Sequence, residues 1–371
     1  MFDFIPVNQY TEIFNYFVLI LYILVFYQCQ RGIIFRKDVV YLNANWGFIV
    51  AILLTVYMGL RPISSAFGDT VNYASGFEEL KHVPMKWNFH GEWLFHNLLH
   101  WFSRNSNIHV FFLFCSTLYV IPLWIACQRI FKDYSYIPFL VVIGMFTFWN
   151  YGVNGIRNGI GASLVILAFT YIENLPLSLL ICFLASGFHT SVFLMIGAGF
   201  IAWFVKNSYY FLAAWLICVI LSYFVGSSIQ GYIASLGIGG EDERFTTYLT
   251  IDAEKFARQE LTVLRTDFRW DFLAYSSMGV AIGWYFIFRR NFRDEYYHWI
   301  YNSFLIANAF WVLIIRAAFS NRFAQISWFI MPIVLIYPFM KKRFWVNHEK
   351  MLGYALLAFY AFAFYYNIVK G

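Results

Sequence analysis

The sequence predicts an all-α polytopic membrane protein, a single integral membrane domain over residues 1–371 with about twelve transmembrane helices. Its residues are 61% hydrophobic and 12% charged, and its mean hydropathy is +0.61. A soluble globular chain carries about 25% charged residues, roughly twice as many. Apolar runs of about 17–25 residues, the length that crosses a bilayer, recur along the sequence. The formal charge of +6 therefore says little about nucleic acid, which we do not expect as a partner.

Twelve apolar segments follow one another, with boundaries accurate to a few residues. The run from 175 to 205 is interrupted by Gly187, His189 and Thr190, and we interpret it as two spans that meet at a polar turn. The other ten segments, in chain order, are Ile13–Cys29, Trp46–Leu60, Ile108–Gln128, Tyr136–Asn150, Arg157–Tyr171, Tyr209–Ser227, Asp271–Phe288, His298–Ile315, Phe323–Met340 and Met351–Ile368.

Lysine and arginine residues gather in alternate connections, which the positive-inside rule assigns to the cytoplasm. With twelve spans, both termini lie outside. If the run from 175 to 205 were one helix, the basic clusters near 290 and 342 would move outside, so we reject that reading. The connection at Glu173 and Asn174 holds no basic residue. The basic residues of the cytoplasmic connections are Arg31, Arg36, Lys37, Arg129, Lys132, Lys206, Arg289, Arg290, Arg293, Lys341, Lys342, Arg343 and Lys350.

Two of the outer connections are long. Residues 61–107 contain an amphipathic stretch, Trp93–Phe102, which we expect to lie in the membrane interface rather than to cross the bilayer. Residues 228–270 contain a glycine-rich segment and then Arg258, Arg265 and Arg269 at near-helical spacing. We expect this second loop to cover a site or to hold a sugar chain.

Four arginines lie at the outer ends of the spans: Arg61, Arg157, Arg316 and Arg322. An outer position runs against the positive-inside tendency. Arginine presents a planar fork that binds phosphate oxygens in pairs while it stays charged. Together these residues predict an anion site, with a diphosphate as the natural ligand. The alternative for each arginine is an ion pair with a nearby acid, or a side chain that extends toward the lipid headgroups.

Around Arg157 the spacing predicts one polar helix face. Asn154, Arg157, Asn158 and Gly161 fall at positions i, i+3, i+4 and i+7 near the start of a span. Small residues at Gly155, Gly159 and Gly161 allow close helix approach, and amides at a helix N-terminus add affinity for an anion. A pure packing role for the glycines is the competing interpretation.

His189 and Asp69 are the candidate bases. His189 lies at the outer turn between two spans, and a histidine pKa of about 6.5 suits a general base. A structural hydrogen bond between helices is the alternative. Asp69 follows Gly68 in a turn near Arg61, where an acid can pair with arginine, bind a sugar hydroxyl or cap the turn. His96 and His100 are spaced i, i+4 but lack a metal-site context, and the five cysteines form no CxxC pair, so we expect no metal.

Four short motifs together resemble the EpsG family of polysaccharide polymerases, relatives of the Wzy-type O-antigen polymerases. They are Gly59–Arg61 followed by Gly68-Asp69-Thr70 and Tyr73, then Arg157-Asn158-Gly159, then Phe188-His189-Thr190-Ser191, and finally Asn321-Arg322-Phe323. They cover most of the chain in family order, although each is short. Asn158 departs from the glutamine that is more common after the arginine.

The resemblance implies a glycosyltransferase with a GT-C-like architecture and an outer-face cavity, in the bacterial cytoplasmic (inner) membrane with its site facing the periplasm. It implies undecaprenyl-diphosphate-linked donor and acceptor oligosaccharides as partners, with membrane lipids and a chain-length regulator protein, and no cofactor. Arg157, Arg316, Arg322 and Arg61 would bind the diphosphate, and His189 or Asp69 would deprotonate the acceptor hydroxyl in an inverting, metal-independent displacement. Tyr73, Asn154, Asn158 and the arginines of the second loop would contact sugar. A lipid-linked oligosaccharide flippase and a polysaccharide ligase are the alternatives, although a flippase often shows repeated halves and this chain has no repeat.

Overall fold

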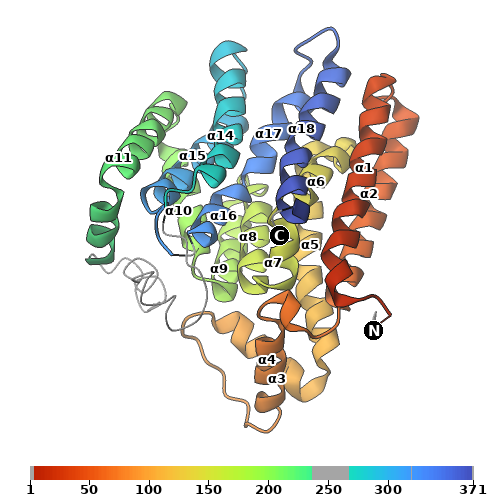
Figure 1. Cartoon of the computed structure of the whole chain (residues 1–371), viewed down its shortest axis with the longest axis vertical. Coiled ribbons are helices and arrows are strands. Elements are labelled where there is room, and N and C mark those ends of the chain that lie inside the picture. Colours follow the sequence, from red (N-terminus) through yellow and green to blue (C-terminus); the bar gives the residue numbers. More distant parts are fainter. Residues whose placement is uncertain (1–3, 236–266, 319, 370–371) are drawn as a thin grey trace. The chain divides into compact units, whose positions relative to one another are not determined.

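The computed structural model describes residues 4–235, 267–318 and 320–369. Within these ranges the regular elements are all helices, which confirms the predicted all-α class (Figure 1). The chain divides into two compact units: unit 1 contains Met1–Phe193 and Phe339–Gly371, and unit 2 contains Leu194–Pro338.

Unit 1 is a series of helices that pack on one another in pairs. Helix α1 (Tyr10–Gln30) packs on α18 (His348–Val369), and α2 (Lys37–Gly59) packs on α5 (Ile108–Phe131). In turn, α5 packs on α8 (Ile156–Phe169), and α8 packs on α9 (Leu175–Phe188). The other elements of unit 1 are the 3-10 turns η1 (Val7–Gln9), η2 (Ser65–Phe67) and η3 (Lys132–Tyr134) and the helices α3 (Thr70–Leu80), α4 (Trp93–Asn105), α6 (Tyr136–Ile143) and α7 (Phe148–Val153).

Polar residues set several helix boundaries in unit 1. Asn107 caps the start of α5 by accepting the backbone N–H of Val110 at 3.1 Å, and Asn174 caps α9 in the same way through Leu177. Lys132 ends α5 in a left-handed conformation, with φ of 53°. These caps explain why the helices begin and end close to the ends of the apolar runs.

The fourth apolar segment is not one helix. It is divided between α6 and α7, with Gly144 at the C-cap of α6. A Cβ on Gly144 would overlap the Tyr22 ring of α1, whose hydroxyl donates to the Leu140 carbonyl at 3.1 Å. The close approach of α1 therefore requires glycine at the point where the helix breaks, and periodicity alone does not reveal this.

The predicted polar turn between the sixth and seventh segments is confirmed. Helix α9 ends at Phe188, and α10 (Val192–Phe204) begins after a turn that contains His189. On α9, Leu179, Leu180 and Phe183 are more than half exposed. Such an apolar surface is the one expected of a helix that faces lipid.

The amphipathic stretch after residue 92 forms α4, and in Figure 1 this helix lies beside α3. Phe95, Leu99 and Phe102 are buried along one side of α4, at the i, i+4, i+7 spacing of an amphipathic helix. Phe95 and Phe102 both contact the Phe111 ring at the start of α5. The helix is therefore confirmed, and its location in the membrane interface remains a prediction.

Unit 2 is held together by a buried hydrogen-bond network on α15 (Glu295–Leu313). The Asn308 amide nitrogen donates to Ser276 at 3.0 Å and to Ser327 at 2.9 Å, and its oxygen accepts from the Trp215 indole at 2.8 Å. These partners belong to α14 (Trp270–Trp284), α16 (Asn321–Trp328) and α11 (Ser208–Ser235). A π-helical turn, η4 (Tyr285–Arg289), extends α14, and α17 (Met331–Lys341) follows α16.

Among the described residues, six helices are long and apolar enough to cross a membrane. Three shorter apolar helices, α8, α9 and α10, add to them. The chain is thus a multi-pass membrane protein. The six long segments are Val7–Gln30, Lys37–Gly59, Ile108–Tyr134, Ser208–Gly226, Asn321–Lys341 and His348–Ile368, and the total of twelve spans remains a prediction.

Candidate functional site

Arg61 follows α2 and is completely buried. Its Nη1 donates to the Met58 carbonyl at 2.6 Å, and its Nη2 donates to the Val153 carbonyl at 2.9 Å and to Thr70 Oγ1 at 3.1 Å. Its guanidinium also lies over the Phe112 ring. Burial lowers the pKa of Arg61 to about 10, so the side chain stays protonated at neutral pH. Of the two roles open to Arg61, these contacts favour the architectural one, because they join α2, α3, α5 and α7.

The turn that carries Asp69 is held by Asn154, two residues before α8. The Asp69 backbone N–H donates to Asn154 Oδ1 at 2.9 Å. Gly68 has φ of 59°, and a Cβ there would overlap the Asn154 amide. Asn154 therefore lies at the junction that precedes α8 and not on the helix itself, because α8 begins at Ile156 with Gly155 as its N-cap. The predicted helix face holds for Arg157, Asn158 and Gly161 and is wrong for Asn154.

The Asp69 side chain is partly exposed at the start of α3 and accepts a hydrogen bond from Asn72 at 3.3 Å. One turn later on the same helix, Tyr73 faces Arg157. Asp69 and Tyr73 are thus placed on one short helix whose position is fixed by Arg61 and Asn154.

Arg157, near the start of α8, contacts two polar side chains from other elements. Its Nε donates to the Tyr73 hydroxyl at 3.2 Å, and its Nη1 forms an ion pair with Glu92 Oε2. About a fifth of its side chain is exposed. The guanidinium is therefore oriented by two groups on separate elements while part of it still faces outward.

Tyr73 remains a neutral phenol at this position. Burial raises the pKa of Tyr73 above its ordinary value, although the Arg157 guanidinium acts in the opposite direction. The phenol oxygen can therefore accept from Arg157 while its own hydrogen stays available to donate.

His189 lies on the other side of the same acid. Its Nδ1 is 3.4 Å from Glu92 Oε1 and 3.1 Å from the backbone nitrogen of Ser191. Close packing produces this arrangement: a Cβ on Gly187 would lie 2.8 Å from Leu94 and 2.9 Å from Trp93. Glycine at 187 thus lets the start of α4 lie against the end of α9, which sets Glu92 beside His189.

Asn158 supports the histidine turn from α8. Its Oδ1 accepts from Ser191 Oγ at 3.3 Å, and its Nδ2 donates to the Tyr151 hydroxyl at 3.4 Å. On the same helix, a Cβ on Gly161 would lie 2.8 Å from Val192. The predicted packing role of this glycine is confirmed, and Asn158 is engaged with protein groups rather than directed to an open space.

Unit 2 carries the other described arginines of the predicted set. Arg316 follows α15, and its Nη2 donates to the Tyr223 carbonyl at 3.4 Å while its guanidinium lies over the Phe268 ring. Arg269 pairs with both oxygens of Asp271 at 3.0 and 2.9 Å at the start of α14. Arg322 is exposed near the start of α16. The two other arginines of the second loop, Arg258 and Arg265, lie outside the described residues.

Glu92, which contacts both Arg157 and His189, is not among the residues that the sequence predicted for this site. It is the only acid between Glu79 and Asp133, and it precedes the amphipathic helix directly. An isolated acid in a segment with several histidines was a signal of its importance. What the sequence could not show is the folding of 92 onto 157 and 189, which the contacts of α4 with α9 create.

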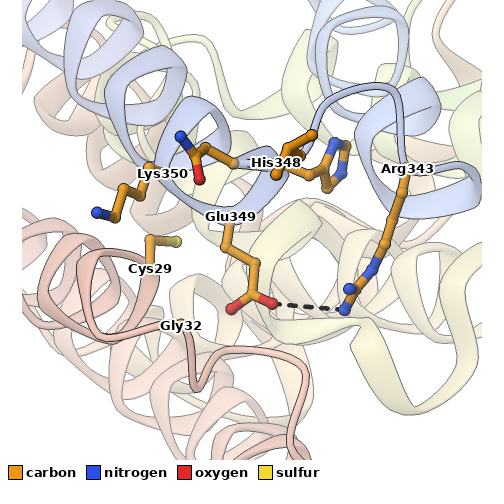
Figure 2. Close-up of a pocket in the computed structure, with 8 residues that line it drawn as sticks. Cys29, Gly32, Arg343, His348, Glu349 and Lys350 are labelled. Atoms are coloured by element: carbon orange, nitrogen blue, oxygen red, sulfur yellow. Dashed lines mark hydrogen bonds and ion pairs between the residues drawn. The ribbon is translucent and has the colours of Figure 1, made fainter.

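A small cavity of about 130 Å³ lies elsewhere in unit 1, where α1 ends and α18 begins (Figure 2). Cys29 and Gly32 line one side, and Arg343 and Glu349 face each other at 3.4 Å on the other. None of its lining residues belongs to the predicted site, and its basic residues come from connections that the charge pattern assigns to the cytoplasm. In the described part of the chain, no three His, Cys, Asp or Glu side chains gather as metal ligands.

Comparison with known proteins agrees with the motif resemblance. A model of the EpsG family matches residues 44–371 and so includes every residue of the site in unit 1. No curated protein and no solved structure matches the chain. The match extends over most of the sequence, and it confirms the resemblance drawn from the four motifs. This multi-pass membrane protein belongs to the EpsG family, a family of Wzy-type polysaccharide polymerases.

Proposed function

We propose that the chain is a glycosyltransferase that polymerises undecaprenyl-diphosphate-linked oligosaccharide repeat units at the outer face of the bacterial cytoplasmic membrane. Family membership supports a polysaccharide polymerase in general. The observation that carries the site is that Arg157, from α8, and His189, from the turn after α9, contact the two carboxylate oxygens of Glu92. An anion-binding group and a proton acceptor side by side are what transfer from a diphosphate to a hydroxyl needs.

In the proposed reaction, the hydroxyl of an acceptor unit attacks the anomeric carbon of the donor chain. The bond from that carbon to the diphosphate oxygen breaks, and undecaprenyl diphosphate leaves with the electron pair. Arg157 stabilises the charge that develops on the diphosphate, and electrostatic stabilisation of this kind commonly lowers the barrier more than any other single effect. His189 takes the proton of the attacking hydroxyl. Attack from the side opposite the leaving group inverts the anomeric centre.

The remaining residues of the cluster have supporting roles in this proposal. Tyr73 orients Arg157 and offers its hydroxyl hydrogen to an oxygen of the substrate. Asp69 is the alternative base, since its carboxylate is partly exposed at the start of α3. Arg316 and Arg322 remain sequence-based candidates for diphosphate ligands. The twelve spans, the GT-C-like architecture and the independence from metal are parts of the same proposal.

The test uses the full-length protein, purified and reconstituted into sealed lipid vesicles. The probe is the undecaprenyl-diphosphate-linked repeat unit, extracted from cells that lack the gene for this protein. A ladder of products that differ by one repeat unit supports the polymerase. Transfer of preformed polymer to a foreign acceptor without a ladder identifies a ligase, and loss of outer-face labelling without any transfer identifies a flippase; either result overturns the proposal.

Variants assign the roles. Arg157→Ala and His189→Ala should leave only single repeats, because each removes a group that acts on the reacting atoms. We expect a loss of at least a hundredfold for either, in the range typical of one catalytic group. His90→Ala, an exposed histidine near Glu92, and Arg36→Ala, an exposed arginine paired with Asp38, are the matched controls and should keep the ladder. Normal chain length in both site variants would refute the assignment.

A further inference from the structure

We propose that Glu92 is the positioning residue of this site: it selects the tautomer of His189 that carries its proton on Nδ1 and so leaves Nε2 to accept the proton of the acceptor hydroxyl. This inference rests on the proposed function, since it concerns the same reaction. Glu92 itself touches neither the hydroxyl nor the anomeric carbon and acts through His189.

Two neighbours of His189 Nδ1 require opposite states of that nitrogen. The Ser191 backbone N–H, 3.1 Å away, can only donate to it, and Glu92 Oε1, 3.4 Å away, can only accept from it when ionised. A neutral imidazole has one N–H and one lone pair. If Nδ1 accepts from Ser191, then Nε2 carries the proton and cannot act as a base. If Nδ1 donates to Glu92, the lone pair is on Nε2.

The charged acceptor decides this competition. A hydrogen bond to an ionised group is roughly twice as strong as one between neutral groups. The Glu92 and His189 side chains are only 14% and 24% exposed, so water screens their interaction less than at an open surface. A closing movement of about 0.5 Å brings Nδ1 and Oε1 to the usual length of such a bond. As His189 takes up a proton during the reaction, the same carboxylate stabilises the imidazolium.

The protein holds the carboxylate in the orientation that this role needs. Arg157 pairs with Oε2, and His189 faces Oε1. Glu92 is also the N-cap of α4, where the helix dipole favours a negative charge. Its backbone carbonyl accepts from the His96 N–H at 3.2 Å, and His96 Nδ1 is 3.0 Å from the same carbonyl. One acid thus links the group proposed to bind the diphosphate to the group proposed to accept the proton.

The acceptor hydroxyl, His189 and water account for the proton in the proposed step. The acceptor O–H bond breaks, its proton passes to His189 Nε2, and its oxygen bonds to the anomeric carbon as the diphosphate leaves. The imidazolium then releases the proton to water. Among the described residues, Arg157 from α8 pairs with the Glu92 carboxylate, Tyr73 from α3 accepts from Arg157, and His96 from α4 contacts the Glu92 carbonyl. Arg157 stays charged in the accessible pH range, and burial keeps Tyr73 protonated.

The dependence of ladder formation on pH tests the inference. The wild-type rate should rise with pH as His189 loses its proton and then reach a plateau. In Glu92→Gln, the amide oxygen can still accept from Arg157, which turns its NH₂ toward Nδ1 and favours the wrong tautomer. We expect the plateau to fall at least tenfold, toward the roughly 10⁴-fold loss known when an amide replaces the acid of a catalytic triad.

The pH range over which the rate of ladder formation rises, the rising limb, distinguishes a positioning role of Glu92 from a purely structural one. Loss of a neighbouring negative charge lowers the pKa of an imidazole, so the limb of Glu92→Gln should move to lower pH. Glu92→Asp keeps the charge and should recover part of the rate with the limb near its original place. His96→Gln and Glu79→Gln are the controls, and both should keep the wild-type limb, since Glu79 is an exposed acid that faces Ser75 instead.

The outcomes for the Glu92 variants decide between a positioning role and a structural one. A wild-type rate and limb in Glu92→Gln would overturn the positioning role, and so would a lower rate with an unmoved limb, which indicates a structural role alone. If Glu92→Gln does not fold, Glu92→Asp carries the test: a rate no higher than that of His189→Ala overturns the inference. A wild-type protein that forms no ladder overturns the proposed function instead, so the two failures are distinguishable.

Discussion

Replacing Arg61 by lysine distinguishes a residue that holds the fold from one that binds substrate. The substitution keeps the charge and removes the planar fork. At present two nitrogens of the fork reach the carbonyls of Met58 and Val153 and the hydroxyl of Thr70. Lysine offers one nitrogen in place of two, so it leaves one or two of these buried acceptors without a partner.

The expected magnitude follows from these contacts. A hydrogen bond to a charged group contributes about 1.5–3 kcal/mol, so Arg61→Lys should destabilise the protein by roughly 2–5 kcal/mol. For a domain of this size, 1 kcal/mol corresponds to about 2–4 °C in Tm. The expected fall in Tm is therefore on the order of 10 °C.

The assay is thermal unfolding of the purified full-length protein in detergent, followed by intrinsic tryptophan fluorescence. Arg36→Lys is the matched control, because Arg36 is exposed and pairs only with Asp38 at 2.8 Å, and its Tm should be unchanged. If Arg61→Lys keeps the wild-type Tm while polymer formation is lost, then Arg61 acts on substrate and the architectural role is refuted.

Two further substitutions test how the site and the second unit are held. Gly68→Ala introduces a side chain at φ of 59° against the Asn154 amide, and should cost about 1–3 kcal/mol and shorten the polymer. Gly76→Ala, a helical glycine with open space around it, should be neutral or stabilising by up to about 1 kcal/mol, and a matching loss in both variants would contradict this reasoning. Asn308→Ala removes three buried hydrogen bonds, including one from Trp215, and should lower the unfolding free energy by roughly 2–3 kcal/mol; an unchanged Tm would show that the network contributes nothing.

Much of the fold could be predicted because long apolar runs directly indicate helices. A segment in lipid must satisfy its own backbone hydrogen bonds, so a long apolar run has few alternatives to a helix. The turn at His189 was predictable for the same reason, since polar residues interrupt an apolar run there. The break between α6 and α7 was not, because it depends on Tyr22 of a different helix, which lies against Gly144.

The candidate site likewise contains residues that the sequence predicts and contacts that it does not. Arg157 and His189 were identified because a basic or titratable residue at the end of an apolar span is costly and therefore conspicuous. Arg61 is equally conspicuous in sequence, yet its contacts are with backbone carbonyls of Met58 and Val153. Nothing in the pattern of residues distinguishes an arginine that binds a ligand from one that binds the chain itself.

By itself, the sequence determined that this chain is a helical membrane protein with polar residues gathered at span ends, and its motifs led to the EpsG family. Only the tertiary structure decided that Glu92 joins Arg157 to His189 and that Asn154 fastens the Asp69 turn. The physical reason is that hydropathy and helical period are local properties. Partnership between charged side chains 65 or more residues apart depends instead on how closely helices pack, and that is set by small residues such as Gly187, whose neighbours the sequence does not name.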